Sequence, residues 1–210
     1  MRILVIGATG GTGNALVAEA LERGHEVTAF VRNPSSFTMK HHGLTVVQGN
    51  VLDGISLESA MKGHSAVVCA LGHKQWFWPT SILSEGTSNI IAAMEKSGVH
   101  RFVCETSLGI GNSWGRMGLY YSLFVGNFIL PFYFYDKVRQ ERIIRASSLE
   151  WVIVRPGQLT NGKKRGTYRH GDKIGNYLWT VCISRKDVAD FMINQISSDQ
   201  YLRQTVGVCG

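Results

Sequence analysis

Residues 2–13 read Arg-Ile-Leu-Val-Ile-Gly-Ala-Thr-Gly-Gly-Thr-Gly, an apolar run followed directly by a glycine-rich loop. The apolar run predicts a strand buried on both faces, and a helical pattern follows over 14–23. The loop has the spacing GxxGxxG, formed by Gly7, Gly10 and Gly13. Glycines at a strand-to-helix junction let the backbone turn sharply and approach a pyrophosphate. A purely structural turn is the alternative, but this position favours a dinucleotide-phosphate loop.

The rest of the chain repeats this alternation of short apolar runs and helical patterns. Alternation at this spacing is typical of βαβ units. It predicts one doubly wound, Rossmann-type α/β domain over 1–210, with a mostly parallel sheet and helices on both faces. The predicted strands are Arg2–Ile6, Glu26–Val31, Thr45–Gln48, Ala66–Leu71, Arg101–Glu105, Trp151–Arg155 and Thr205–Val208. The predicted helices are Asn14–Arg23, Leu57–Met61, Ser81–Lys96, Lys137–Ala146 and Lys186–Ile196.

The composition is that of an ordinary globular protein. With 210 residues, 44% of them hydrophobic and 18% charged, the chain is not expected to be disordered, collagen-like or a coiled coil. The net charge of +7 favours an anionic ligand or partner. The basic residues are dispersed and no nucleic-acid-binding module is recognised, so nucleic acid is not an expected partner.

The four cysteines, Cys69, Cys104, Cys182 and Cys209, form no CxxC pair. They indicate buried, reduced thiols of a cytoplasmic protein rather than a disulfide framework. The first apolar run is too short for a signal peptide. No spacing of His, Cys or acidic residues suggests a metal site.

The end of the second predicted strand bears on the choice of cofactor. NAD sites usually place an acidic residue there, on the ribose 2′-hydroxyl. This chain has Val31-Arg32-Asn33 instead. A guanidinium at this point can bind a 2′-phosphate through two hydrogen bonds, so Arg32 predicts NADP(H); an ordinary surface arginine is the alternative.

Two segments interrupt the βαβ rhythm. Met117–Tyr135 is rich in aromatic residues and carries no charge. It is long enough to span a bilayer only marginally, so we expect a buried or substrate-covering segment, with attachment to a membrane surface or a partner as the alternatives. Asn161–Lys173 is glycine-rich and basic, which predicts a solvated loop or a lip for an anionic ligand.

Several short motifs occur together along nearly the whole chain. They include Gly-Ala-Thr-Gly-Gly-Thr-Gly at 7–13, Val-Arg-Asn at 31–33, Val-Gln-Gly-Asn-Val-Leu-Asp at 47–53, Ala-Leu-Gly at 70–72, Ser-Glu-Gly-Thr-Ser-Asn-Ile-Ile-Ala-Ala-Met at 84–94, Glu-Thr-Ser at 105–107 and Val-Arg-Pro-Gly at 154–157. With these motifs the chain resembles the atypical short-chain dehydrogenases/reductases of the NmrA-like, NAD(P)H-binding group. Within that group it is most similar to the biliverdin-IXβ reductase/flavin reductase family.

The resemblance implies roles for residues at the ends of the strands. Those implied to hold the phosphates are Gly7, Thr9, Gly10, Gly11, Thr12, Gly13 and Arg32. Those implied to lie along the adenine, the ribose and the nicotinamide are Asn50, Val51, Ala70, Leu71, Gly72, Thr106, Ser107, Pro156, Gly157 and Gln158. The chain departs from the reductase pattern at Asn50, where Asp is usual, at Gly157, where a histidine stands near the active site, and in the aromatic segment 117–135.

Three residues are candidates for the chemistry. Tyr133 and Lys137 have a Tyr-x-x-x-Lys spacing, which puts both side chains on one face of a helix. In the wider superfamily this spacing pairs a proton-donating tyrosine with a lysine that also holds the ribose. Ser107 follows the fifth predicted strand, at the sheet edge where α/β proteins place their sites. Chance spacing and a structural turn serine are the alternatives.

Tryptophans near the expected cleft suggest the kind of substrate. Trp76 and Trp78 follow the fourth strand, and Trp114 begins an aromatic insertion at 114–135. Aromatic walls suit a flat conjugated molecule, although these rings can also simply pack on one another. The leading hypothesis is therefore an NADPH-dependent reductase acting on a planar flavin, quinone or bilin, as a monomer or homodimer. A redox sensor that binds NADP(H) without turnover and a membrane-associated scaffold are the alternatives.

Overall fold

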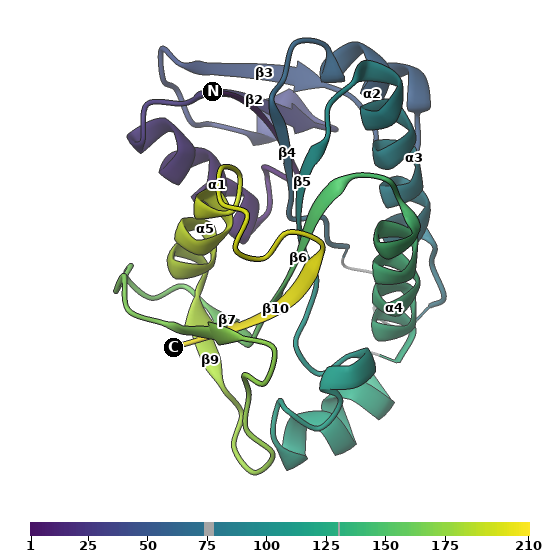
Figure 1. The fold of residues 1–210 in the computed structure, drawn as a ribbon, viewed down its shortest axis with the longest axis vertical. Helices are drawn as coiled ribbons and strands as arrows, with labels where there is room; N and C mark the ends of the chain where they lie inside the picture. The colour runs from purple at the N-terminus through teal and green to yellow at the C-terminus, as the bar shows by residue number, and fades with distance from the viewer. Residues whose placement is uncertain (74–77, 130) are drawn as a thin grey trace.

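In the computed structural model, a sheet of eight strands lies between two layers of helices (Figure 1). The structure describes residues 1–73, 78–129 and 131–210. The strand order is β3-β2-β1-β4-β5-β6-β10-β8, and every pair is parallel except β10 with β8. The strands are β1 (Arg2–Ile6), β2 (Glu26–Val31), β3 (Leu44–Gln48), β4 (Ala66–Cys69), β5 (Arg101–Glu105), β6 (Glu150–Pro156), β8 (Arg169–Gly171) and β10 (Gln204–Cys209). The predicted Rossmann-type doubly wound sheet is thereby confirmed.

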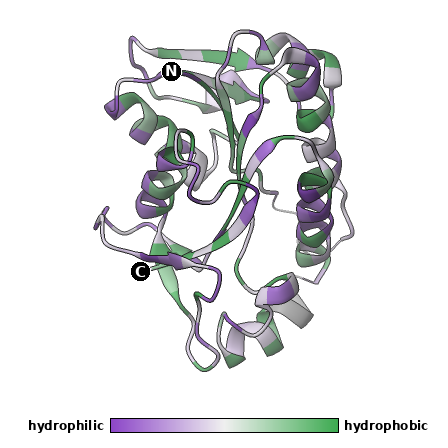
Figure 2. Cartoon of the chain, viewed as in Figure 1, coloured by the Kyte–Doolittle hydropathy of each residue, from purple (hydrophilic) through white to green (hydrophobic). Residues whose placement is uncertain are grey.

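Both faces of the sheet are covered by helices. Helices α1 (Gly11–Glu22) and α5 (Arg185–Asn194) lie on one face, and α2 (Gly54–Met61), α3 (Ile82–Ser97) and α4 (Pro131–Ala146) lie on the other (Figure 1). Side chains of β1 alternate between the two cores, as a pleated strand requires: Ile3 packs with the α1 side and Leu4 with the α2 side. In Figure 2 hydrophobic residues dominate the central strands. Each fully buried aliphatic side chain of this kind contributes roughly 1.5–3 kcal/mol.

The structure extends the predicted helix Lys137–Ala146 by almost two turns. Helix α4 begins at Pro131, a residue well suited to a first helical turn, so Tyr133 and Lys137 lie on one continuous helix. The same helix caps its neighbour, because the buried Asp136 carboxylate accepts hydrogen bonds from the backbone N–H groups of Leu83 and Ser84 at 2.9 and 3.3 Å. The start of α3 thus depends on a residue about fifty positions away.

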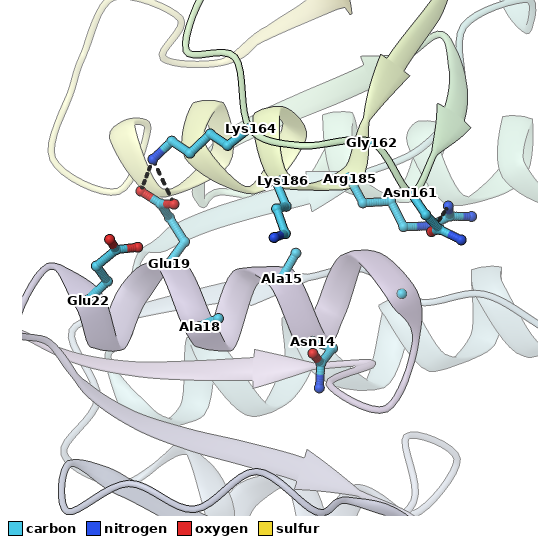
Figure 3. Close-up of a pocket in the computed structure, with 11 residues that line it drawn as sticks. Asn14, Ala15, Ala18, Glu19, Glu22, Asn161, Gly162, Lys164, Arg185 and Lys186 are labelled. Carbon is cyan, nitrogen blue, oxygen red and sulfur yellow. Dashed lines mark hydrogen bonds and ion pairs between the residues drawn. The ribbon is translucent and has the colours of Figure 1, made fainter.

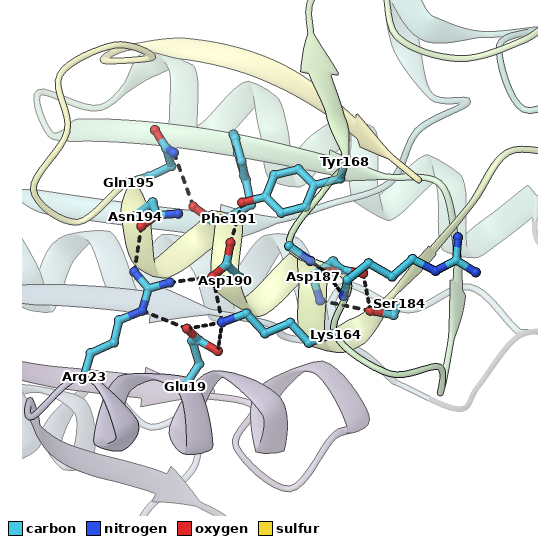
Figure 4. A network of polar contacts seen from close by, with 12 residues as sticks. Glu19, Arg23, Lys164, Tyr168, Ser184, Asp187, Asp190, Phe191, Asn194 and Gln195 are labelled. Carbon is cyan, nitrogen blue, oxygen red and sulfur yellow. Dashed lines mark hydrogen bonds and ion pairs between the residues drawn. The ribbon is translucent and has the colours of Figure 1, made fainter.

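The basic segment Asn161–Lys173 is not simply a solvated loop. It contributes β8, and it lies in the chain between the two strands of a second small sheet, β7 (Gln158–Thr160) and β9 (Cys182–Ser184). Lys164 forms ion pairs with Glu19 of α1 at 2.7 Å and with Asp190 of α5 at 2.8 Å, and the Tyr168 hydroxyl donates to Asp190 at 2.6 Å (Figure 4). These contacts hold the segment against the pair of helices.

The aromatic segment Met117–Tyr135 forms a π-helical stretch, η3 (Tyr121–Ile129), and the start of α4. The expectation of a buried segment is wrong for most of its described side chains: Tyr120 is 67% exposed, Phe124 58% and Tyr135 66%. Sequence reasoning failed here because uninterrupted apolarity does not distinguish a core helix from an exposed one. Within residues 1–73, 78–129 and 131–210, no helix combines the length and apolarity needed to cross a membrane.

The cysteines are all free, as expected, and Cys69, Cys104 and Cys209 are buried. Cys182 is exposed, which corrects the prediction for that thiol. It begins the short strand β9, in which the next two residues, Ile183 and Ser184, are buried.

Candidate cofactor and acceptor site

The glycine loop lies tightly against the end of β4. Gly7 has a φ of +82°, and a Cβ atom on it would be 2.4 Å from the Ala70 carbonyl oxygen. A Cβ on Gly13 would be 2.0 Å from the Gly7 oxygen, and the Gly10 N–H closes the turn on that same oxygen at 2.9 Å. Neither Gly7 nor Gly13 can carry a side chain without moving the backbone. The loop therefore has the close-packed form that a pyrophosphate cradle requires.

The N-terminus of α1 is open to a ligand. The helix begins at Gly11, and its N-cap Gly10 provides no side-chain acceptor for the first N–H groups. Such groups, together with the helix dipole, attract anions. Thr9 and Gly10 are exposed at the tip of the loop, whereas Thr12 is buried beneath it.

Thr12 connects the loop to a carboxylate that sequence reasoning did not single out. Its hydroxyl donates to the Glu105 side chain at 3.1 Å, and Glu105 is only 6% exposed at the end of β5. Burial raises the pKa of the Glu105 carboxyl. The signal was present in the sequence, because Glu105 is an acid that directly follows the apolar run Phe102–Cys104.

Lys137 lies at the point where β4 and β5 end. It is 2% exposed, and its Nζ donates to the carbonyl oxygens of Glu105 at 3.1 Å and Leu71 at 3.3 Å. Burial alone would lower the pKa of Lys137, but the Tyr133 phenol, the Cys104 thiol and Glu105 together hold it above its usual value. An ammonium group has three donors, and the hydrogen bonds of Lys137 to the described residues use two of them.

Tyr133 lies one turn before Lys137 on α4. The Lys137 Nζ is 5.6 Å from the centre of its ring, and a Cβ on Gly72 would be 3.7 Å from its hydroxyl oxygen. The His73 ring meets the Tyr133 ring edge-on at 5.0 Å. The structure therefore brings the predicted Tyr133, Lys137, Leu71 and Gly72 together.

Thr106 and Ser107 follow β5 as predicted, but their hydroxyls are already engaged. The buried Thr106 hydroxyl donates to Glu141 at 2.8 Å, and the half-buried Ser107 hydroxyl donates to the Leu108 carbonyl at 2.9 Å. Thr106 is thus oriented into the protein. The Ser107 oxygen keeps acceptor capacity, and it would donate to a ligand only after rotation.

A buried ion pair supports this edge of the sheet. Arg155 of β6 donates to both oxygens of Glu141, at 2.7 and 2.6 Å, and to the Asn112 side chain at 2.5 Å. Burial would raise the pKa of Glu141, but the hydrogen bonds and charge of Arg155 bring it below its usual range. The pair joins α4, β6 and the 109–114 loop.

The predicted adenine end of the site is open. Arg32 is exposed at the end of β2, and among the described residues no carboxylate pairs with it. The side chain of Asn50 accepts a hydrogen bond from the Leu52 N–H at 3.1 Å, and Val51 is buried so close to α3 that a Cβ on Gly86 would be 2.9 Å from it. Arg32 and Asn50 are therefore accessible, whereas the Val51 side chain is buried and its carbonyl oxygen accepts a hydrogen bond from Asn89 at 3.0 Å.

The segment Pro156–Gln158 joins β6 to β7. A Cβ on Gly157 would be 2.6 Å from the Val181 carbonyl oxygen, so a histidine at this position would require the Val181 backbone to move. Packing against Val181 therefore accounts for a glycine at this position. Pro156 and Gly157 are buried and Gln158 is exposed.

The predicted tryptophan walls are separated in the structure. Trp114 lines a hollow of about 410 Å³ between the 109–111 backbone, η3 and α4, together with Tyr121, Phe134 and Tyr135. Trp78 is 77% exposed and lies outside that lining. Trp76 falls outside the described residues.

A second hollow, of about 540 Å³, lies between α1, α5 and the Asn161–Lys164 segment (Figure 3). Arg185 stands at its end nearest the glycine loop: a Cβ on Gly11 would be 2.7 Å from its Cδ and Nε atoms, and its Nη1 donates to Asn161 at 2.7 Å. Sequence reasoning missed Arg185. The available signal was Ser184, which caps α5 by accepting from the Asp187 N–H at 3.0 Å and so puts Arg185 first in the helix.

Comparisons with known proteins agree with this geometry. Residues 7–199 match the family model described as NAD(P)H-binding. An uncharacterized chloroplastic protein of Arabidopsis thaliana is 29% identical over 208 residues, which are 95% of this chain and 73% of that protein. Several other curated relatives are longer, and the chain spans 20–32% of their length.

Solved structures show the same fold. ChuY, an anaerobilin reductase from Escherichia coli O157:H7, has a TM-score of 0.80 at 23% identity, covering 100% of this chain and 97% of its own. A short-chain dehydrogenase/reductase from Veillonella parvula in complex with NADP has a TM-score of 0.80 at 19% identity, covering 100% and 94%. With the family model matching more than nine-tenths of its length, the chain belongs to the NAD(P)H-binding family of Rossmann-type proteins.

Proposed function

We propose that this protein is an NADPH-dependent oxidoreductase that reduces a planar conjugated acceptor of the flavin, quinone or bilin type. The observation that carries the proposal is the convergence of a close-packed glycine loop with Lys137 and Tyr133 at the ends of β4 and β5. A glycine loop with no catalytic side chain beside it would support cofactor binding without catalysis. A buried lysine beside a tyrosine ring, with one donor not used by its hydrogen bonds to the described residues, supports chemistry as well.

The residues fit NADP(H) because the cradle accepts no side chain at Gly7 or Gly13 and opens at the N-terminus of α1. Bound NADPH supplies a hydride. The first N–H groups of α1 would hold the pyrophosphate, Lys137 would hold the ribose hydroxyls and Arg32 would bind the 2′-phosphate. The open position of Arg32, with no carboxylate of the described chain competing for it, supports the preference for NADPH over NADH.

The acceptor side relies on aromatic walls. The hollow lined by Trp114, Tyr121 and Phe134 is also lined by Gly109 and Ile110, which come shortly after Ser107 in the chain. Its volume of about 410 Å³ is enough for a flat ring system. Stacking of a conjugated ring on such walls contributes roughly 0.5–1.5 kcal/mol per contact beyond area burial. Tyr133 would donate a proton to the acceptor as the hydride arrives, and water can replace it where the reduced acceptor is a weak base.

The test follows NADPH oxidation by the pure protein against a panel of flavins, quinones, bilins and simple carbonyl compounds. With the best acceptor, Tyr133→Phe should lower kcat by about 10²-fold and leave NADPH binding unchanged, as loss of a general acid does. Tyr177→Phe is the matched control, because Tyr177 is 64% exposed and lies outside both hollows. A protein that binds NADPH but reduces no acceptor would support the redox-sensor alternative instead.

A second candidate function is attachment to a membrane or partner surface. One observation favours it: Leu119, Tyr120, Leu123 and Phe124 are 46–67% exposed on one helical stretch. Flotation with lipid vesicles tests it, and a Tyr120→Ser, Phe124→Ser double variant should lose any binding that this surface provides.

A further inference from the structure

The described lining of the acceptor hollow carries no charged side chain. Aromatic walls come from Trp114, Tyr121, Phe134 and Tyr135, and aliphatic ones from Ile110 and Val138. The remaining described lining residues are glycine, serine and proline. The described lining therefore offers hydrogen bonds but no counter-ion.

Several cations around the hollow contact other groups or lie outside its lining, and Lys137 donates to the carbonyl oxygens of Leu71 and Glu105. Arg155 lies behind Gly111, where a Cβ would be 3.3 Å from its Nη2, but it is 4% exposed and committed to Glu141 and Asn112. Arg116 donates to the carbonyl oxygen of Asp172. The exposed arginines of α4, Arg139 and Arg142, are not part of the lining.

This lining discriminates among flat acceptors. Flavin nucleotides carry a phosphate and bilins carry carboxylates, and an anion placed in an apolar site loses hydration without gaining a partner. A quinone carries only two carbonyl oxygens. These can accept hydrogen bonds from the hydroxyls of Tyr121 and Tyr135, which line the hollow. Burial raises the pKa of the Tyr121 phenol, so that hydroxyl stays a donor at neutral pH.

We infer that the acceptor of this site is an uncharged quinone rather than a flavin nucleotide or a bilin, a conclusion that rests on the reductase function proposed above. In the reaction the quinone accepts a hydride from NADPH, which brings two electrons and one hydrogen. Its second oxygen takes one proton from water or from Tyr133, so that the hydroquinone forms and NADP⁺ remains. No further oxidant or reductant is required.

The experiment uses two acceptors that share one ring system: a neutral naphthoquinone and the same naphthoquinone carrying an anionic sulfonate group. Equilibrium dialysis measures their binding to the cofactor-saturated protein, independently of turnover. The neutral quinone should bind at least about tenfold more tightly, because the sulfonate would be desolvated without a counter-ion. Equal or tighter binding of the sulfonate would overturn the inference.

A charge-reversal variant sharpens the test. Tyr135→Lys puts a cation at the rim of the hollow and should raise affinity for the sulfonate several-fold while lowering that for the neutral quinone. Trp179→Lys is the matched control, since Trp179 is 75% exposed and lies outside the lining. The same increase in affinity for the sulfonated quinone in both variants would indicate general attraction to the protein surface and would contradict binding in the hollow.

Steady-state kinetics separate this inference from the function on which it rests. A higher kcat/KM for FMN or biliverdin than for the neutral quinone would overturn the inference and leave the reductase function standing. Selective quinone binding without oxidation of NADPH by any acceptor would overturn the reductase function and retain the uncharged site.

Discussion

The buried ion pair between Glu141 and Arg155 offers a sharp test of how the candidate site is held together. The carboxylate is 4% exposed and accepts four hydrogen bonds, two from Arg155, one from Arg145 at 2.9 Å and one from Thr106 at 2.8 Å. Glu141→Gln keeps the shape of the side chain but replaces one acceptor oxygen with a donor. That donor then faces a guanidinium N–H group.

The expected loss of stability follows from the charge that remains buried in the variant. In the variant Arg155, itself 4% exposed, keeps its charge without a carboxylate partner. Removing one partner of a buried pair typically costs about 3–5 kcal/mol. For a protein whose total stability is about 5–15 kcal/mol, this is a large fraction.

Urea unfolding followed by circular dichroism measures the effect. With an m-value of about 2–3 kcal/mol/M, the midpoint should fall by at least about 1 M. The control is Glu58→Gln, which removes an exposed ion pair with Lys96 at 2.6 Å and should cost about 0–1 kcal/mol. Equal midpoint shifts for the two variants would refute the assignment of Glu141 as a buried anchor.

The same pair predicts a dependence on pH. The pKa of Glu141 is lower in the folded protein than in the unfolded chain, so its carboxylate stabilises the fold above the unfolded value of about 4.3. That contribution is lost as pH falls through the folded pKa. The stability difference between the native protein and Glu141→Gln should therefore be full at neutral pH and shrink below about pH 4. A difference that is unchanged in acid would show that charge is not its origin.

Three further outcomes are expected. Arg32→Ala should weaken NADPH binding about 10- to 100-fold and barely change NADH binding, because a charged phosphate contact contributes roughly 1.5–3 kcal/mol. Equal losses of affinity for the two cofactors in calorimetry would exclude contact with the 2′-phosphate. Gly157→Ala should destabilise the protein by about 1–3 kcal/mol in thermal unfolding, because its Cβ would meet the Val181 oxygen at 2.6 Å, and an unchanged Tm would show that this backbone yields. Trp114→Ala should raise the KM of a planar acceptor several-fold, whereas Trp78→Ala, which removes a ring outside the hollow, should not.

The glycine loop and the sheet could be predicted because their signals are local. Strand β1 is a continuous apolar run, and Gly7 and Gly13 occupy positions where the backbone geometry excludes a side chain. Strand bounds agree within a residue or two because burial on both faces leaves little freedom in the pattern. The Tyr133–Lys137 spacing was likewise visible, since one helical turn fixes which side chains share a face.

The partners of buried polar groups were beyond sequence reasoning. Thr106 was expected at the nicotinamide, yet its hydroxyl is used by Glu141, thirty-five positions away. The carboxylate beneath Thr12 and the guanidinium beside Gly11 come from Glu105 and Arg185, which are distant in the chain. Such pairs form only where packed elements bring them within hydrogen-bond distance.

The aromatic residues show most clearly which properties the sequence determines and which depend on the tertiary structure. The sequence by itself suggested a flat conjugated ligand, because it places tryptophans near the expected cleft and aromatic side chains offer faces for stacking. Only the tertiary structure decided that Trp114 lines a hollow, that Trp78 is exposed and that no charge of the described chain enters that lining. Local sequence sets backbone conformation and periodicity, whereas exposure and electrostatic surroundings are properties of the whole packed chain.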